Sequence, residues 1–214
     1  MQDFPSLRFA FVRHAQARAS DDSYNERTPL SPLGRRQAEA LGRMLLDRGP
    51  FEAIYSSPLP RCVETAAPFC EALRLNPILD RRLVEFEFEE QTLPVALSRP
   101  DLLIWDGVHR GRSAGETLSE FSERVYGWLD EVAERHLGSD VAVFTHSGVI
   151  DAAIRWAVGL SAHAPWMHDF PISNASVTEL EFWPRGRVAE GAPRYTEFRR
   201  IAETSHLVDC HSSM

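Results

Sequence analysis

The sequence has few cysteines and no long apolar run, and these two absences exclude several classes of protein. Its three cysteines, Cys62, Cys70 and Cys210, form neither an even disulfide framework nor a paired metal-ligand spacing, so we expect reduced structural thiols. The most apolar later stretch, 148–160, is interrupted by charged residues and is too short to span a bilayer. The first residues also lack the cationic and apolar segments of a secretory signal. These features predict a cytoplasmic protein.

The sequence also lacks an excess of basic residues, internal repeats and low-complexity segments. Its formal net charge is −8, which argues against a nucleic-acid or anionic-membrane surface because such binding needs a broad basic face. It does not exclude a local basic pocket. A length of 214 residues with 43% hydrophobic and 25% charged residues is typical of a globular protein, so we expect residues 1–214 to form a single domain. Nothing in the sequence indicates an oligomeric state.

What the sequence does have is three short apolar runs that end on cationic or imidazole side chains. A run without polar positions predicts a strand that is covered on both faces of a sheet. The runs and the side chains that follow them are 8–13 with Arg13 and His14, 52–55 with Arg61, and 141–145 with His146. Because ligands of open α/β sheets bind outside the carboxyl ends of the strands, we expect these four side chains to converge on an anion site.

The other periodic segments complete the predicted fold. Helices are expected from Ser31-Pro32 to Gly49, after Ser57-Pro58 with a kink or an early end at Pro68, over 117–138 and over 147–158. Two further strands, 175–182 and 195–201, are expected to be joined by a turn at 184–186 and to add an antiparallel edge. Strands that alternate with helices predict a three-layer α/β/α fold with a mainly parallel central sheet.

The pattern weakens between about 78 and 115, where Pro94 and Pro100 interrupt it. We interpret this stretch as a small lobe inserted over the active site, where it would select the substrate. Two interpretations remain for His109, Arg110 and Arg112: a site for a second anionic group of the substrate, or a solvated basic loop.

Five sequence blocks together resemble one known family. They are Arg13-His14, the stretch Leu-Ser-Pro-Leu-Gly-Arg-Arg-Gln-Ala at 30–38, Ser57-Pro58 followed by Arg61 and Glu64-Thr65-Ala66, Gly115-Glu116-Thr117, and Thr145-His146-Ser147-Gly148. In this order they are similar to the histidine phosphatase superfamily, the phosphoglycerate-mutase-like proteins. The resemblance covers the chain from residue 8 to about 180.

The resemblance implies roles for the residues at the strand ends. His14 would be the catalytic nucleophile that accepts a phosphoryl group, and Arg13, Arg61 and His146 would bind the phosphate oxygens, with His146 also serving in catalysis. The physical chemistry agrees, because phosphoryl transfer needs positioning and positive charge around three equatorial oxygens. A histidine attacks only when neutral, and flanking arginines disfavour its charged form.

The resemblance also implies a general acid at Glu85, in the pattern Arg82-Leu83-Val84-Glu85. Glu85 would protonate the leaving alcohol, with its pKa raised by the bound phosphate. The family commonly continues with a glycine and a Trp-Glu-Gly run, whereas this chain continues with an acidic-aromatic run. Glu87 and Glu89 are therefore kept as alternatives.

Other departures from the family concern the loop after the nucleophile. Ala15 stands where the family usually has glycine, which bears on how closely the backbone approaches the phosphate. Ser20 replaces an asparagine, so a phosphate contact is either lost or supplied by Gln16. Glu116 is open to a simpler interpretation, as a favourable charge in the first turn of its helix.

The predicted function is a phosphomonoester hydrolase that acts through a phosphohistidine on a small phosphorylated metabolite, without cofactor or metal. Nucleic acids and membranes are not expected partners. The alternatives are a phosphoglycerate mutase, which shares the first half-reaction, and a catalytically inactive phospho-ligand binding module. The chain lacks the tryptophan-asparagine signature that commonly follows the nucleophile in cofactor-dependent mutases, which favours the phosphatase.

Two unrelated activities fit poorly. A serine hydrolase built on Ser147 would need glycines two residues before and after it, and the chain has Thr145 and Val149 there. A metal hydrolase would need grouped ligands, and the eight histidines show no such spacing.

Overall fold

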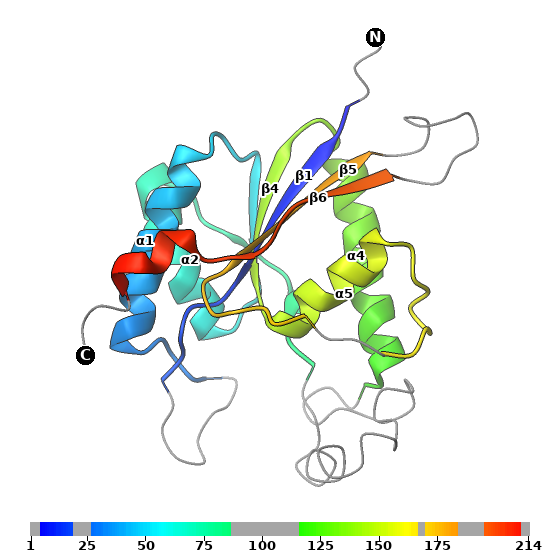
Figure 1. Cartoon of the computed structure of the whole chain (residues 1–214), viewed down its shortest axis with the longest axis horizontal. Coiled ribbons are helices and arrows are strands. Elements are labelled where there is room, and N and C mark those ends of the chain that lie inside the picture. The colour runs from blue at the N-terminus through cyan, green and yellow to red at the C-terminus, as the bar shows by residue number, and fades with distance from the viewer. Residues whose placement is uncertain (1–4, 19–26, 87–115, 167–169, 184–194, 211–214) are drawn as a thin grey trace, which may run out of the picture.

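The computed structural model describes residues 5–18, 27–86, 116–166, 170–183 and 195–210 (Figure 1). One mixed sheet has the strand order β3-β2-β4-β1-β5-β6. Its strands are β1 (Leu7–Arg13), β2 (Ala53–Ser56), β3 (Ile78–Leu79), β4 (Asp140–Thr145), β5 (Val177–Trp183) and β6 (Tyr195–Glu203). The four strands from β3 to β1 run parallel, whereas β5 is antiparallel to both β1 and β6. The predicted parallel centre and antiparallel edge are thus confirmed.

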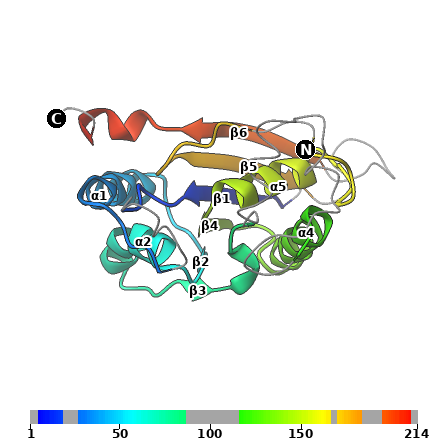
Figure 2. The ribbon, with the colours of Figure 1, turned by 90° about the horizontal axis from the view of Figure 1, so that it is seen from below.

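Helices cover both faces of the sheet, which makes the predicted three layers. The helices α1 (Pro32–Asp47) and α2 (Pro60–Leu73) lie on one face, and α4 (Leu118–Arg135) and α5 (Ser147–Ala157) on the other (Figure 2). Alternate side chains of β1 serve the two cores: Phe9 and Phe11 pack on the α4–α5 side, and Ala10 and Val12 on the α1–α2 side. Because β1 is buried on both faces, its apolar run has no polar positions.

The start of α1 is built to pack on the loop after β1. Ser31 caps the helix by accepting a hydrogen bond from Gly34 N at 3.0 Å, with Pro32 at the first helical position, as predicted. Ser31 N in turn donates to Gln16 O at 2.9 Å. A Cβ at position 34 would lie 2.0 Å from that same carbonyl oxygen, so only glycine permits this approach.

The second helix and the predicted lobe differ in part from expectation. The helix α2 continues through Pro68 to Leu73, so the early end is wrong. The start of the predicted lobe holds the edge strand β3 and a short helical turn η1 (Arg81–Leu83), neither of which we predicted. Phe86, which follows this turn, packs against Phe121 of α4 with ring centroids 5.6 Å apart. The rest of the lobe, 87–115, and the turn at 184–186 lie outside the described residues.

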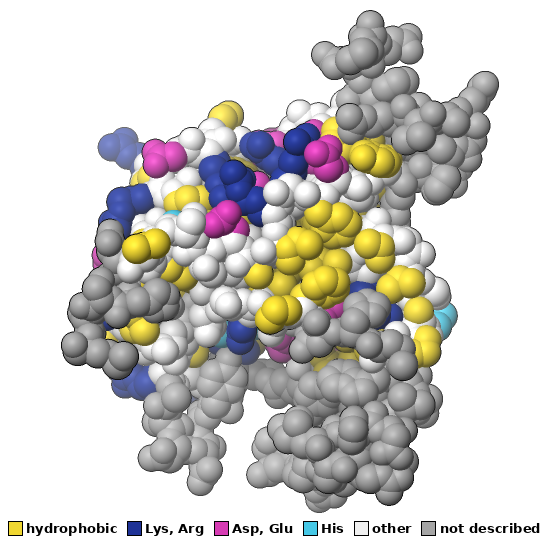
Figure 3. Space-filling model, viewed as in Figure 1, with side chains coloured by type: hydrophobic (Ala, Val, Ile, Leu, Met, Phe, Trp, Pro, Cys, Tyr) yellow, Lys and Arg dark blue, Asp and Glu magenta, His cyan; other side chains and the backbone are white. Residues whose placement is uncertain are grey.

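Arginines on β6 pair with buried and half-buried acids on β5. Arg199 contacts Glu181 at 2.6 Å, and Arg200 contacts Glu179 at 2.5 Å. On the face shown in Figure 3, basic and acidic side chains lie next to each other in mixed clusters. Such neighbouring opposite charges give no broad basic field on this face. No helix among the described residues is long and apolar enough to cross a membrane.

Candidate active site

The three strand ends that carry the predicted site residues are neighbours in the sheet. The strands β2, β4 and β1 are adjacent and parallel, so their carboxyl ends lie along one edge. The pairing continues past the strands, because His14 N donates to Thr145 O at 2.8 Å and Ser57 N donates to Phe144 O at 2.9 Å. The rings of His14 and His146 consequently meet edge to face, with centroids 5.2 Å apart. The structure thus brings the two predicted histidines together at this edge.

The loop that carries His14 is fixed from three sides. Ala15 N donates to Thr65 Oγ1 at 2.9 Å, and Gln16 N donates to Gln37 Oε1 at 2.9 Å. Ala15 is fully buried and does not adopt a positive φ, so alanine fits where the family usually has glycine. Because Thr65 already occupies the Ala15 N–H, this group is not free to bind a phosphate.

The third support of the loop comes from the segment before β5 and from the C-terminal end of the described chain. Asn174 Nδ2 donates to His14 O at 3.0 Å, and Ala175 N is shared between the carbonyls of Arg13 and His14 at 3.1 and 3.2 Å. His206 Nε2 donates to Ala175 O at 2.9 Å. His206 belongs to the short helix η3 (Ser205–Cys210), which we did not predict.

His14 is held as a neutral imidazole whose Nδ1 is bonded to the backbone. Its Nδ1 lies 2.8 Å from Ala15 O. A carbonyl oxygen only accepts, so Nδ1 carries the proton and the lone pair is on Nε2. Burial, opposed by this hydrogen bond and assisted by the charges of Arg61 and Arg13, lowers the pKa of His14 to about 3. The side chain is therefore neutral at physiological pH, which is the state in which an imidazole can act as a nucleophile.

His146 and Arg61 are fully enclosed beside His14. His146 Nε2 lies 3.0 Å from Ser57 Oγ and 3.4 Å from Cys62 Sγ. Burial, with the nearby His14 and Arg61, lowers the pKa of His146 well below its usual range. Arg61 is only 2% exposed, and its carbonyl accepts from Thr65 Oγ1 at 2.5 Å, which ties the first turn of α2 to the same threonine that holds the His14 loop.

Arg13 completes the cationic group from the end of β1. Its Nη1 donates to Ile172 O, and its buried Nε has no hydrogen-bond partner among the described residues. Arg13 and Arg61 both lower the pKa of His14, so both guanidinium charges lie near the imidazole. Two arginines and two neutral imidazoles with little water around them form a site that favours an anion.

Glu85 faces the start of α5, next to His146. Its Oε2 accepts from Gly148 N at 3.0 Å and from Ser147 Oγ at 3.2 Å, and its Oε1 accepts from Phe86 N at 3.0 Å. Burial raises the pKa of Glu85, while these hydrogen bonds favour its charged form. The net direction is upward, as a general acid requires. A Cβ at position 148 would lie 2.4 Å from Glu85 Oε1, so glycine there makes room for the carboxylate.

Of the other predicted site residues, the structure describes Gln16 but not the remaining candidates of the loops. Gln16 is exposed, and its Oε1 accepts from Ser31 Oγ at 2.7 Å, so only its amide nitrogen could donate to a phosphate. The remaining candidates lie outside the described residues: Ser20, Glu87, Glu89, His109, Arg110 and Arg112. No group of three or more potential metal ligands occurs in the described ranges.

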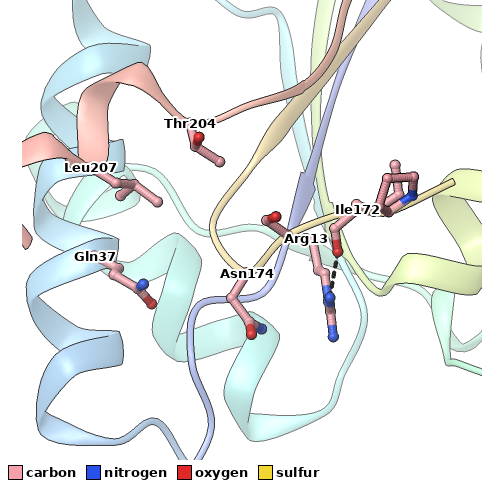
Figure 4. Close-up of a pocket in the computed structure, with 8 residues that line it drawn as sticks. Arg13, Gln37, Ile172, Asn174, Thr204 and Leu207 are labelled. Carbon is pink, nitrogen blue, oxygen red and sulfur yellow. Dashed lines mark hydrogen bonds between the residues drawn. The ribbon is translucent and has the colours of Figure 1, made fainter. Parts of the chain in front are cut away.

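A pocket of about 530 Å³ opens beside Arg13 (Figure 4). Gln37 comes to it from α1, and Thr204 comes from the end of the chain that follows β6. The full lining is Arg13, Gln37, Pro171, Ile172, Ser173, Asn174, Thr204 and Leu207. One cation and several amide and hydroxyl groups make this lining suited to a polar organic group.

The depressed pKa of His14 predicts a loss of stability in acid. The ordinary pKa is 6.5 and the folded value is about 3, so the unfolded chain binds more protons in this range. This contribution is complete above the unfolded value and is lost as the pH falls toward 3. As the pH falls from about 7.5 to about 4.5, the shifted pKa of His14 should lower the free energy of unfolding by about 2–3 kcal/mol.

Urea unfolding at the two pH values, on the wild type and on His14→Asn, measures this effect. The variant should lose about 2–3 kcal/mol less than the wild type over the same interval. An identical pH dependence of the two proteins would mean that His14 is not held neutral.

Comparisons with known proteins bear on the family and the fold. The sequence profile of the histidine phosphatase superfamily (branch 1) matches residues 9–192. Phosphoserine phosphatase 1 of Hydrogenobacter thermophilus is 30% identical over 166 residues, which cover 74% of this chain and 77% of that protein. A bifunctional protein of Mycobacterium tuberculosis is 30% identical over 215 residues, which cover 94% of this chain and 55% of that protein. This chain thus spans about half the length of the second relative.

Among solved structures, a mycobacterial glucosyl-3-phosphoglycerate phosphatase in complex with inorganic phosphate has a similar fold. Its TM-score is 0.69 at 23% sequence identity, and the match covers 93% of this chain and 98% of that one.

Proposed function

Since the chain belongs to branch 1 of the histidine phosphatase superfamily, we propose that it hydrolyses small phosphomonoesters through a phosphohistidine intermediate on His14. The observation that carries this proposal is the state of His14. Its Nδ1 proton is bonded to a backbone carbonyl, its pKa is lowered to about 3, and Arg13, Arg61 and His146 lie around it. A neutral nucleophile among cationic groups is what attack on a phosphate dianion needs.

In the first half-reaction, the lone pair of His14 Nε2 attacks phosphorus and the bond from phosphorus to the ester oxygen breaks. The leaving oxygen takes the electron pair of that bond and a proton from Glu85. Arg13 and Arg61 bind the equatorial oxygens, where negative charge is concentrated in the transition state. His146, which starts neutral, adds a further imidazole contact to the phosphate.

In the second half-reaction, the Glu85 carboxylate takes a proton from water. The water oxygen attacks phosphorus, the bond from phosphorus to Nε2 breaks, and its electron pair returns to the imidazole. Glu85 ends protonated, so the cycle restores both groups. The raised pKa of Glu85 supports this double role, because an acid that titrates nearer neutral pH gives up and regains a proton readily.

The substrate proposed is a small phosphorylated metabolite with polar groups near the ester. The pocket beside Arg13 supports this choice, since Gln37, Asn174 and Thr204 offer hydrogen bonds to hydroxyl, carboxylate or amino groups. Phosphoserine has such groups, and a relative at 30% identity is named a phosphoserine phosphatase. The free, buried cysteines support the expected reducing cytoplasm as the place of action.

We expect hydrolysis to be faster than phosphoryl transfer to a second substrate. With a phosphoglycerate as substrate, free phosphate and the isomeric phosphoglycerate are measured in the same reaction. We expect phosphate release to dominate and a bisphosphate primer to leave the product ratio unchanged. Isomer formation that dominates and rises with the primer would establish the mutase instead. Binding of phosphoesters without turnover of any member of a metabolite panel would establish the inactive binding module.

A further inference from the structure

Side chains from two other elements hold the segment that leads to Glu85. The three carbonyl groups before it, those of residues 82–84, each accept a hydrogen bond from such a side chain. Arg124 Nη1, from α4, donates to the first and the third at 2.6 and 3.1 Å. Thr145 Oγ1, at the end of β4, donates to the middle one at 2.8 Å. Residues 82–84 are thus fixed against both α4 and β4.

Arg124 is itself held in one orientation. Its Nε and Nη2 donate to the two carboxylate oxygens of Glu116 at 3.0 and 2.5 Å. Its guanidinium lies over the Phe121 ring, 4.9 Å from the centroid. The side chains of Arg124 and Glu116 are only 20% and 13% exposed. A planar guanidinium can serve a carboxylate and two carbonyls at once, which a lysine ammonium cannot do in the same geometry.

The residue after Glu85 is fixed on the same helix. Phe86 is buried, and its ring meets that of Phe121 with centroids 5.6 Å apart. Glu85 therefore lies between two anchored points, 82–84 and Phe86, both of which depend on α4. The backbone on both sides of Glu85 is thus held by residues more than 30 positions away in the sequence.

We propose that Arg124, oriented by Glu116, is a positioning residue that fixes Glu85 for proton transfer to the leaving oxygen. The proposal rests on the proposed role of Glu85 as general acid. Arg124 acts through the backbone carbonyls and does not contact the substrate. The Glu116 carboxylate pairs with the Arg124 guanidinium, so the effect of Arg124 on Glu85 comes from placement, although its charge also helps to lower the pKa of His146.

Replacement of Arg124 with methionine keeps a long apolar stem and removes all donors. If Glu85 shifts, proton transfer to a basic alkoxide suffers, whereas nitrophenolate leaves without a proton. For Arg124→Met we expect kcat/KM on an alkyl phosphate to fall about 10–100-fold and kcat/KM on nitrophenyl phosphate to change by less than about threefold. Steady-state kinetics on both substrates measure this selectivity.

Two further variants separate this effect from general destabilisation. Arg135→Met removes another arginine of α4, which pairs with Glu131 and is 55% exposed. This variant should leave kcat/KM unchanged on both substrates. Glu116→Gln leaves the Arg124 donors in place but weakens their orientation, and should give a smaller loss with the same selectivity. It also tests the proposal if Arg124→Met fails to fold.

The double variant Glu85→Gln with Arg124→Met decides between the outcomes. If Arg124 acts through Glu85, adding Arg124→Met should lower kcat/KM on the alkyl phosphate by less than about threefold beyond the loss that Glu85→Gln causes. Glu85→Gln without leaving-group selectivity would overturn the general-acid assignment. Suppose instead that the loss from Glu85→Gln depends on the leaving group. Equal losses on both substrates for Arg124→Met and Glu116→Gln would then overturn the positioning role of Arg124. Fully multiplicative losses in the double variant would overturn it as well.

Discussion

Replacing His14 with alanine should lower kcat by at least about 10⁴-fold on any phosphomonoester that the protein hydrolyses. The variant should still bind phosphate, because Arg13 at the end of β1, Arg61 in the first turn of α2 and His146 after β4 remain in place. What the variant loses is the Nε2 lone pair, and with it the covalent step. We therefore expect KM to change much less than kcat.

The control for this variant is His163→Ala, since His163 is exposed and its imidazole pairs with the exposed Glu123. That variant should keep wild-type activity. Inorganic phosphate should still inhibit or bind the His14→Ala protein, which a calorimetric titration measures. Retention of more than about a tenth of wild-type kcat in a preparation free of contaminating phosphatase would remove His14 from the mechanism.

Replacing Glu85 with glutamine should lower kcat/KM on an alkyl phosphate by about 10²–10⁴-fold and cost much less on nitrophenyl phosphate. Glutamine keeps the size of the side chain, and its oxygen can still accept from Gly148 N, so the loss reports the missing proton. The raised pKa of Glu85 also predicts a basic limb in the wild-type pH profile on the alkyl phosphate, where the acid becomes ionised. Glu85→Gln should lack that limb.

Equal losses on both substrates would assign Glu85 to phosphate binding or to folding. Leaving-group-dependent losses for Glu87→Gln or Glu89→Gln, together with none for Glu85→Gln, would show that the acid is another member of the acidic-aromatic run. The contacts of Glu85 with Ser147 and Gly148 favour Glu85, because they place its carboxylate at the strand end that carries His146.

Sequence patterns predict the part of the site that depends on local order. The apolar runs before Arg13-His14 and His146 identify strands, and the rule that ligands bind at the carboxyl ends of such strands predicts that these side chains share one edge. That β1 and β4 are direct neighbours is seen only in the structure. Ser31-Pro32 likewise predicts the start of α1, because capping is a local interaction. These features needed only neighbouring residues to be recognised.

The supports of the site could not be found this way, because they join distant segments. Asn174 holds the His14 carbonyl across 160 residues, and Arg124 holds residues 82–84 across about 40. Nothing near Asn174 in the sequence distinguishes it from a loop asparagine. Glu116 was open to interpretation as a helix-end charge, whereas the structure pairs it with Arg124. The two-residue strand β3 is too short for any periodicity to show.

The most direct test of the mechanism is to trap the covalent intermediate. The protein is mixed with nitrophenyl phosphate in the presence of a metal chelator, quenched in alkali, where phosphohistidine is retained, and digested for peptide mapping by mass spectrometry. We predict one phosphate on His14 in the wild type and in Glu85→Gln, with none in His14→Ala. Phosphate on Ser147, or turnover that continues with no phosphorylated peptide, would contradict the account.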